Sequence, residues 1–400
     1  MIDVDWYVLS FLVFVGIVAF LVYRKRKDVT HKYYLFYRYD TEKGKDLIDR
    51  IAKINPKFWK HFGSFGIFVG FCGMIFAASF IINSYITYIT APQLFTPTLS
   101  LVIPIPFSEI FFVPGFLGVP FWYWVIPVGI LVFFHEGTHA VLARAEKIKI
   151  KTLGLFLLTI IPGAFVEPDE KQLKKANWKS RIRIYAGGSY ANIMVGLVFF
   201  IFIAGAYLPA FYENTLAFGA YSYTENMTEM PAKANNLTGS IYSVNGERVR
   251  SIQDLAEIME STEPGDTLEI RALKGTVIAP LFDIIVAKDL VFEDYSIETV
   301  EVEGRPVIGI SGPFYNVKIL KEDVGNPVFM NFITGLLIWI CLINIGVGVV
   351  NMLPIKPLDG GLIIETLGER FLPKYKDNIT KGFSFIFLFL IIGNFVIGFV

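Results

Sequence analysis

Two histidines and a glutamate lie close together in the stretch FFHEGTHA: His135, Glu136 and His139. Residues four apart on a helix share one face, so both imidazoles would point the same way, about one turn apart. Two such histidines can bind a metal ion, and the neighbouring glutamate can take a proton from a metal-bound water. The pattern therefore predicts one Zn²⁺, with His135 and His139 as ligands and Glu136 as general base.

The surroundings of this motif make a chance occurrence improbable. Residues 121–134 carry no charge, and the whole chain has only four histidines. Polar groups in an apolar membrane segment cost roughly 2.5–3.5 kcal/mol each when they lie near the bilayer centre. Such groups are retained where they have a partner or a function, which favours the metal site.

A catalytic zinc site normally has three protein ligands and one open position, so one ligand is still needed. The remaining histidines, His31 and His61, lie in a basic segment away from the motif. Asp359, in NMLPIKPLDGG, follows an apolar run and two prolines that would break a helix. We predict Asp359 as the third ligand. The alternative is an Asp-Gly turn at the membrane surface.

Composition indicates an integral membrane protein. Of 400 residues, 54% are hydrophobic and 18% are charged. Several long runs carry no Asp, Glu, Lys or Arg, which is typical of membrane-spanning helices. The first span has an acidic start and basic residues after it, so it resembles a retained anchor and not a signal peptide. Six spans are predicted, near residues 6–23, 64–88, 121–143, 187–209, 328–350 and 382–400.

Two further segments are apolar but are not predicted to span the membrane. Residues 91–120 are rich in proline and could form an interfacial or re-entrant segment. Residues 148–166 alternate and are β-branched, which predicts strands at the membrane surface. The fold class is thus a polytopic α-helical bundle with re-entrant or membrane-surface strands and an inserted α+β domain.

The boundaries follow from these changes in composition. We expect an anchor helix with a basic segment, the first part of the membrane core, an inserted domain, and the second part of the core with the last span. These are residues 1–61, 62–211, 212–323 and 324–400.

Charge predicts the orientation. Residues 24–60 hold twelve Lys/Arg against five Asp/Glu, and residues 143–183 hold ten against four. The positive-inside rule places both in the cytoplasm. With six spans, the N-terminus and the inserted domain then lie outside a cell membrane, and the motif lies toward the cytoplasmic side. The basic stretches fit a membrane flank, so no nucleic-acid partner is expected. The two cysteines lie in apolar spans and form no disulfide framework.

Three motifs together resemble the site-2 protease family of intramembrane zinc metalloproteases: HEGTH, NMLPIKPLDGG and Gly188-Ser189-Tyr190-Ala191-Asn192. Ser189 stands where the family usually has proline. The resemblance covers spans three to five. It implies hydrolysis of peptide bonds in or near transmembrane segments of single-span membrane proteins. It also makes Asn192 and Asn351 candidates for binding the substrate backbone or the oxyanion, although an asparagine can equally pack between helices.

The inserted domain carries local signals of its own. A strand IYSV meets Asn245-Gly246, a strong hairpin signal, and Ser251 with Asp254 predicts a capped helix. The order resembles a PDZ domain, which would bind peptide segments by strand addition. We place the start of its peptide-binding groove near residues 216–221.

Two other functions compete with proteolysis. One is a proteolytically idle scaffold that binds peptides through the PDZ domain, but such a protein has no reason to keep Glu136. The other is a transporter whose polar residues line a metal or proton path, which would predict matching halves that the sequence lacks. For the protease, the strands near 148–166 could pair with an unwound substrate or could merely cover the active site.

Overall fold

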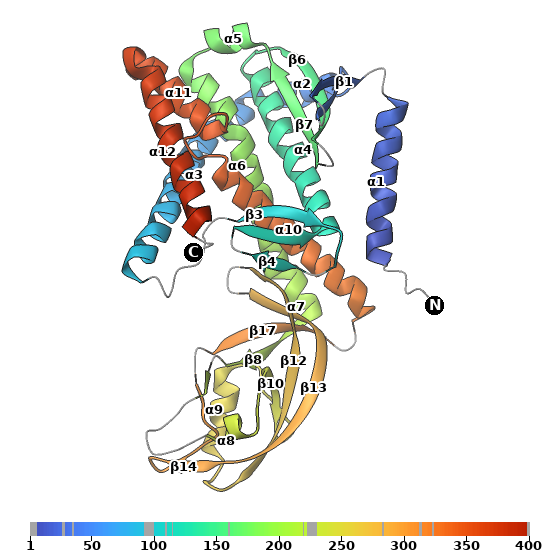
Figure 1. Ribbon diagram of the computed structural model, residues 1–400, viewed down its shortest axis with the longest axis vertical. Helices are drawn as coiled ribbons and strands as arrows, with labels where there is room; N and C mark the ends of the chain where they lie inside the picture. The colour runs from blue at the N-terminus through green and yellow to red at the C-terminus, as the bar shows by residue number, and fades with distance from the viewer. Residues whose placement is uncertain are drawn as a thin grey trace. The chain divides into compact units, whose positions relative to one another are not determined.

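The chain divides into two compact units, residues 1–199 with 339–400 and residues 200–338. The computed structural model, drawn in Figure 1, describes residues 6–25, 29–33, 36–91, 100–108, 110–113, 115–158, 161–218, 220–221, 230–281, 284–311, 314–321 and 324–397.

The six predicted spans are confirmed as six long apolar helices (Figure 1). They are α1 (Trp6–Arg24), α3 (Pro56–Thr90), α4 (Phe121–Ala145), α6 (Trp178–Phe202), α10 (Pro327–Val350) and α12 (Lys376–Ile397). α3 begins eight residues before the predicted span, because Pro56 occupies its first position and the Asn55 side chain accepts from the backbone N–H of Phe58. α6 continues through a π-helical turn, η2 (Ile203–Tyr207), into α7 (Leu208–Phe211).

Close packing of α4 against α6 places the metal-binding motif. The buried Leu142 of α4 packs with Ile184 of α6 in one apolar cluster. A Cβ on Gly187 would collide with the Leu142 side chain, so glycine is needed for this approach. Nearer the start of α4, Trp124 and Leu131 pack against Trp339 and Ile343 of α10. α4 is therefore held in the first unit by two neighbouring helices, α6 and α10.

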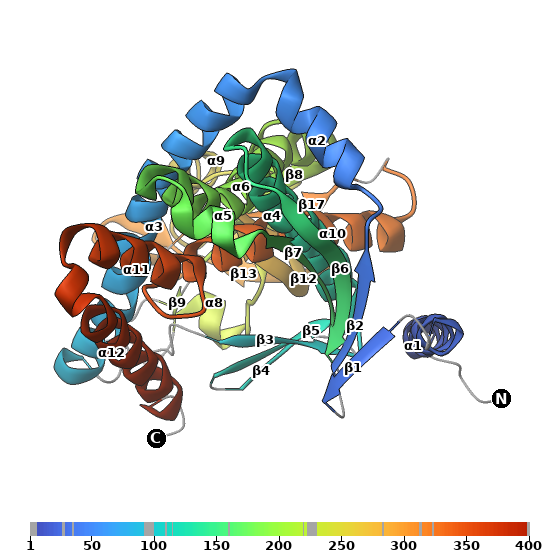
Figure 2. The ribbon, with the colours of Figure 1, turned by 90° about the horizontal axis from the view of Figure 1, so that it is seen from above.

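The first unit also contains a four-stranded sheet of order β1-β2-β6-β7. Its members are β1 (Val29–Tyr33), β2 (Phe36–Thr41), β6 (Ile150–Leu158) and β7 (Ile161–Pro168), and β7 packs against α4 (Figure 2). The predicted strands near 148–166 are thereby confirmed as strands. β1 and β2 were not predicted: β1 pairs with β2, and the pairing of β2 with β6 joins segments more than a hundred residues apart.

The proline-rich segment forms strands where it is described. β3 (Leu101–Ile105) and β4 (Phe111–Val113) flank β5 (Phe116–Pro120) in a three-stranded sheet. Pro104 fits in β3 because an outer strand needs ladder donors on one edge alone. The short helices of this unit are α2 (Lys45–Ile54), α5 (Glu170–Lys175), α11 (Asp359–Phe371) and the 3₁₀ turn η3 (Pro373–Tyr375).

The loop between α10 and α11 brings Asp359 back toward the spans. The backbone N–H of Gly360 donates to the carbonyl of Asn351, 3.0 Å away. Gly360 and Gly361 lie so close to the backbone of Met352 and Ile355 that a Cβ on either would collide with it. The two glycines let the loop fold onto the start of α11, and Asp359 becomes the first residue of that helix.

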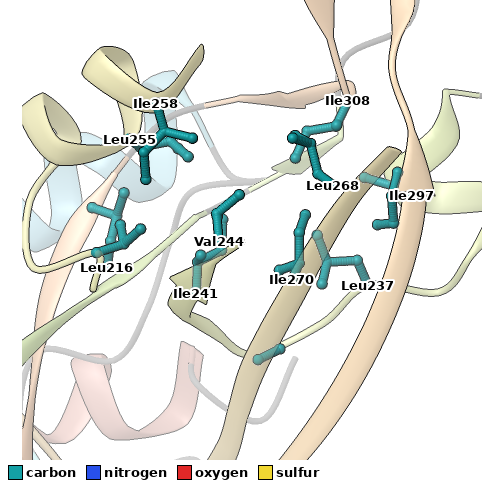
Figure 3. Packing of buried hydrophobic residues seen from close by; sticks show 13 residues of the cluster. Leu216, Leu237, Ile241, Val244, Leu255, Ile258, Leu268, Ile270, Ile297 and Ile308 are labelled. Carbon is teal, nitrogen blue, oxygen red and sulfur yellow. The ribbon is translucent and has the colours of Figure 1, made fainter. Parts of the chain in front are cut away.

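The second unit is built on a six-stranded sheet of order β11-β10-β12-β13-β17-β8, and a pairing between β8 and β10 closes it. Its strands are β8 (Tyr212–Ala217), β10 (Ser240–Val244), β11 (Glu247–Arg248), β12 (Thr267–Leu281), β13 (Ile284–Glu298) and β17 (Tyr315–Leu320). Two small pairs, β9 (Ala220–Tyr221) with β16 (Ile310–Ser311) and β14 (Val300–Val302) with β15 (Arg305–Val307), and two helices, α8 (Pro231–Ala234) and α9 (Ile252–Glu260), complete it. Figure 3 shows side chains of its aliphatic core, among them Ile241, Leu255 and Leu268.

Local predictions for this unit are confirmed. Asn245 and Gly246 both have positive φ, 50° and 85°, as a type I′ turn between β10 and β11 requires. Ser251 and Asp254 form the predicted capping box at the start of α9. The proposed start of a peptide groove at residues 216–221 is wrong for its first part. Leu216 and Ala217 are paired on both sides, with β10 and with β17, so they have no edge to offer a peptide.

The capping box gives a first prediction. Ser251→Ala should destabilise the second unit by about 1 kcal/mol, because the backbone N–H of Asp254 loses its acceptor and the Asp254 carboxylate loses the hydroxyl donor. Amides of α9 should then exchange with solvent deuterium about fivefold faster in the full-length protein. Ser261→Ala, at the other end of α9, is the control, since its hydroxyl bonds a carbonyl that also accepts from the Ser261 N–H. Equal exchange in the two variants would contradict the prediction.

The pH dependence of this box follows from Asp254. Its carboxyl pKa lies below the ordinary value, because the backbone N–H of Arg250 and the hydroxyl of Ser251 donate to it. A lowered folded pKa means that the contribution is present above the pKa of an unfolded aspartate and is lost as the pH falls through the folded pKa.

Candidate metal centre

The two histidines of the motif face each other on α4. Their Nε2 atoms lie 3.1 Å apart, and their ring planes are nearly perpendicular at 86°. The helical spacing of four residues produces this, as the sequence predicted. Two ring nitrogens directed at the same point cannot stabilise each other while both are neutral acceptors or both are donors, so the arrangement suits a cation between them.

Asp359 completes a cluster of three metal-binding side chains. One carboxylate oxygen lies 3.5 Å from His135 Nε2, and the other lies 3.6 Å from His139 Nε2. The ligand atoms of the three residues all lie within 4.8 Å of one another. Tetrahedral zinc with bonds of about 2.0–2.1 Å places its ligand atoms roughly 3.3 Å apart. The separation of the two nitrogens is close to that value, and each nitrogen lies close to that distance from one of the two Asp359 oxygens.

The donor chemistry fits zinc as well. Two imidazole nitrogens and one carboxylate oxygen form a ligand set found in catalytic zinc sites. Asp359 is 7% exposed, so an unpartnered carboxylate there would be costly. A divalent cation among these three side chains would offset that cost, so the trio could hold a metal ion.

The hydrogen bonds of His139 leave the correct nitrogen available. Its Nδ1 lies 2.7 Å from the backbone carbonyl oxygen of Ile184 on α6. A carbonyl can only accept, so Nδ1 carries the proton and Nε2 presents its lone pair to the cluster. This is the tautomer that a metal ligand needs.

Glu136 lies beside the cluster and is held by β7. Its Oε2 accepts a hydrogen bond from the backbone N–H of Val166 at 3.0 Å. That bond fixes one carboxylate oxygen while the other can still accept a proton. The predicted general base is therefore positioned by the outer strand of the sheet.

The two asparagines occupy different places. Asn351 donates through Nδ2 to Asp359 Oδ2 at 3.0 Å, and the same atom lies 3.3 Å from His135 Nε2. Asn351 thus lies on the side of the cluster where the ligand atoms meet. Asn192 is fully buried, and its amide lies 3.0 Å from the opposite ring nitrogen, His135 Nδ1. The structure brings both predicted asparagines to the site, although on different sides of the His135 ring.

Three further contacts at the site were not predicted from the sequence. The hydroxyl of Ser189 donates to Asp359 Oδ2 at 2.9 Å. Gly188 lies so close to the histidines that a Cβ would come within 2.9 Å of His135 Cε1 and closer still to His139 Nε2. The third is the Val166 N–H. The motif G-S-Y-A-N was a signal for the first two, because glycine next to a small polar residue in an apolar helix indicates close packing around a polar group.

Comparison with known proteins agrees with this site. Residues 123–393 match the model of peptidase family M50, and that range contains the histidine pair, Glu136 and Asp359. An uncharacterized protein of Methanocaldococcus jannaschii is 26% identical over 268 residues, which cover 66% of this chain and 62% of that relative. The predicted resemblance to the site-2 protease family is confirmed by the first match. With its six long apolar helices and a cluster of side chains that could hold a metal ion, the chain belongs to peptidase family M50.

Proposed function

We propose that this protein is an intramembrane metalloprotease that uses one Zn²⁺ to hydrolyse peptide bonds in or near transmembrane segments of single-span membrane proteins. The observation that carries the proposal is the meeting of His135, His139 and Asp359 beside Glu136, with the histidines and Glu136 on α4, a helix long and apolar enough to span a bilayer. The family match supports the peptidase activity.

Each side chain then has a definite role. His135, His139 and Asp359 hold the metal, which when bound polarises the scissile carbonyl and makes a water acidic. Glu136 accepts the proton of that water and later gives it to the leaving amine. The Val166 N–H keeps the glutamate directed at the cluster. Asn351, whose amide lies beside two ligands, is suited to donate to the substrate backbone or to the developing oxyanion.

The outer edge of β7 is a suitable place for the substrate backbone. Because the Val166 N–H donates to Glu136, it points away from β6, and alternate residues of a strand share that direction. Residues 162, 164, 166 and 168 therefore face outward. Pro162 and Pro168 have no N–H, and the Val166 N–H already donates to Glu136, so of these four positions Ala164 remains to donate to a substrate at this edge. We propose that an unwound substrate pairs there, next to Glu136.

The second unit is proposed to be a PDZ-like domain that binds peptide segments. The order of strand, turn, strand and capped helix from β10 to α9 supports this, and so does the closed sheet around its core. β8 is ruled out as the strand that receives the peptide at Leu216 and Ala217, because both are already paired on two sides.

The protein is proposed to lie in a cell membrane as a multi-pass protein. Its N-terminus and PDZ-like domain would be outside and the active site would lie toward the cytoplasm, as the distribution of Lys and Arg predicts. The idle scaffold is not favoured, because Glu136 and the three ligand side chains are all present and brought together.

A chelator experiment tests the proposal. The full-length protein in detergent should cleave a labelled transmembrane peptide, lose this activity with a zinc chelator and regain it with added Zn²⁺. Asp359→Ala should lose both bound zinc and cleavage, because one of three ligands is removed. Asp377→Ala is the matched control, since that side chain is 76% exposed at the start of α12. If Asp359→Ala retained full zinc and activity, the proposed ligand set would be wrong.

A further inference from the structure

All three proposed metal ligands hydrogen-bond to a single helix, α6. His139 donates to the carbonyl of Ile184, Asp359 accepts from Ser189, and His135 meets Asn192. The ligands themselves come from α4 and from the start of α11, so α6 supplies no ligand. It contacts the side chain of each of the three ligands.

The spacing along α6 accounts for this arrangement. Ile184, Gly188 and Asn192 are four residues apart and share one helix face, and Ser189 lies at the edge of that face. Gly188, in the middle, has no side chain and leaves room for both histidine rings. Polar groups of α6 on both sides of Gly188 thus contact the ligand side chains.

We propose that α6 sets the geometry of the metal centre, with Ser189 and Asn192 as positioning residues for Asp359 and His135. This inference rests on the proposed zinc site. It differs from the substrate-binding role predicted for Asn192 from the sequence, and it gives Ser189 a role that the sequence did not indicate.

Asn192 lies on the side of the His135 ring that faces away from the proposed metal position, so it cannot reach a substrate bound there. Its amide contacts Nδ1, whereas Nε2 is the atom that faces the cluster. Its side chain is fully buried, and its Cβ packs near Gly348 of α10. What Asn192 can do is fix the rotation and the tautomer of the imidazole, because the partner of the non-ligating nitrogen decides both.

The required tautomer also determines how the amide is turned. A ligand Nε2 has no proton, so Nδ1 carries it and needs an acceptor. The oxygen and nitrogen of an asparagine amide are interchangeable in shape, and their hydrogen-bond partners decide between them. With Nδ2 toward His135, Oδ1 is buried without a partner among the described residues. With the amide turned over, Oδ1 accepts from the Nδ1 proton, as metal binding demands.

Ser189 fixes the orientation of the Asp359 carboxylate. Asp359 Oδ2 accepts from the Ser189 hydroxyl at 2.9 Å and from Asn351 Nδ2 at 3.0 Å. Two donors on one oxygen fix the carboxylate plane and leave Oδ1 directed at His139, 3.6 Å away. Proline, which the family resemblance places at this position, has no hydroxyl. The Ser189 bond is therefore a property of this chain and not of the motif.

Zinc affinity is the readout that tests the inference. We would measure it on the full-length protein in detergent by competition with a chromogenic chelator. Ser189→Ala and Asn192→Leu should each weaken zinc binding about 10–100-fold, because each leaves a ligand without its orienting partner. Asn192→Asp keeps an acceptor for Nδ1 and Ser189→Thr keeps the hydroxyl, so both should retain most of the affinity.

A second pair of the same residue types serves as the control. Ser84 of α3 and Asn394 of α12 are buried and bonded to each other at 2.7 Å. Ser84→Ala and Asn394→Leu should leave zinc affinity unchanged, even where they lower the melting temperature of the metal-free protein. A purely structural role would instead make site and control variants behave alike, with lost thermal stability and similar zinc affinity.

Two outcomes would contradict the inference, and the measurements distinguish them. Zinc binding that depends on Asp359 but is as tight in Ser189→Ala and Asn192→Leu as in wild type would overturn this inference alone. Zinc binding that survives Asp359→Ala would overturn the proposed function, and the inference with it.

Discussion

Glu136→Gln should lower the rate of peptide cleavage by about 10²–10⁴ while zinc stays bound. The carboxamide has nearly the shape of the carboxylate, and its oxygen can still accept from the Val166 N–H, 3.0 Å away. His135 and His139 keep their nitrogens, so the metal site should be intact. What is lost is the proton acceptor, and no proton can be taken from the attacking water at the same rate.

The comparison needs bound zinc and cleavage from the same preparation. Wild type and Glu136→Gln would be assayed in detergent or liposomes on a labelled transmembrane peptide. Glu167→Gln is the matched control, because Glu167 is also a carboxylate on β7 but pairs with Arg38 at 3.0 Å. It should cleave at close to the wild-type rate. Equal cleavage by Glu136→Gln and wild type, with equal zinc, would mean that Glu136 is not the base.

The same experiment separates the competing functions. An idle scaffold predicts no cleavage by either protein and no difference between them. A transporter predicts altered transport without proteolysis in either form. A large loss of cleavage in the variant, with zinc retained, is expected from the protease alone, since that function requires a proton acceptor beside the metal.

Features that depend on neighbouring residues could be predicted from the sequence. The histidine pair faces one point because a helix repeats every 3.6 residues, whatever the helix packs against. The turn at Asn245-Gly246 and the capping box at Ser251 are formed by residues within five positions of each other. The six spans followed from runs without charge, because each such helix is long enough to cross a bilayer by itself.

Features that join distant segments could not be predicted. The bond between Ser189 and Asp359 connects residues 170 apart in the sequence. Nothing in the local pattern shows which face of α6 meets the loop after α10. The pairing of β2 with β6 and the bond from Val166 to Glu136 are of the same kind. Asn192 was recognised as a candidate, yet its place on the Nδ1 side of His135 is decided by helix packing.

Gly188→Ala should strongly weaken zinc binding at the proposed metal centre. A Cβ at this position would come within 2.9 Å of His135 Cε1 and closer to His139 Nε2. His139 cannot simply turn aside, because its Nδ1 is bonded to the carbonyl of Ile184. The His139 ring can avoid the added Cβ only by breaking that hydrogen bond or by moving away from the metal. Zinc affinity should therefore fall by more than the roughly 10–100-fold expected for the loss of an orienting partner.

Gly137→Ala provides the matched control within the motif itself. A Cβ on Gly137, between Glu136 and the second histidine, would meet nothing within 4 Å. Both substitutions replace glycine by alanine in a helix interior, where the helix propensity of alanine is higher by about 1 kcal/mol. Zinc affinity by chelator competition should therefore be unchanged in Gly137→Ala and nearly abolished in Gly188→Ala. If both variants bound zinc like wild type, the histidines would not meet the metal across Gly188, and α6 would not be the helix that shapes the site.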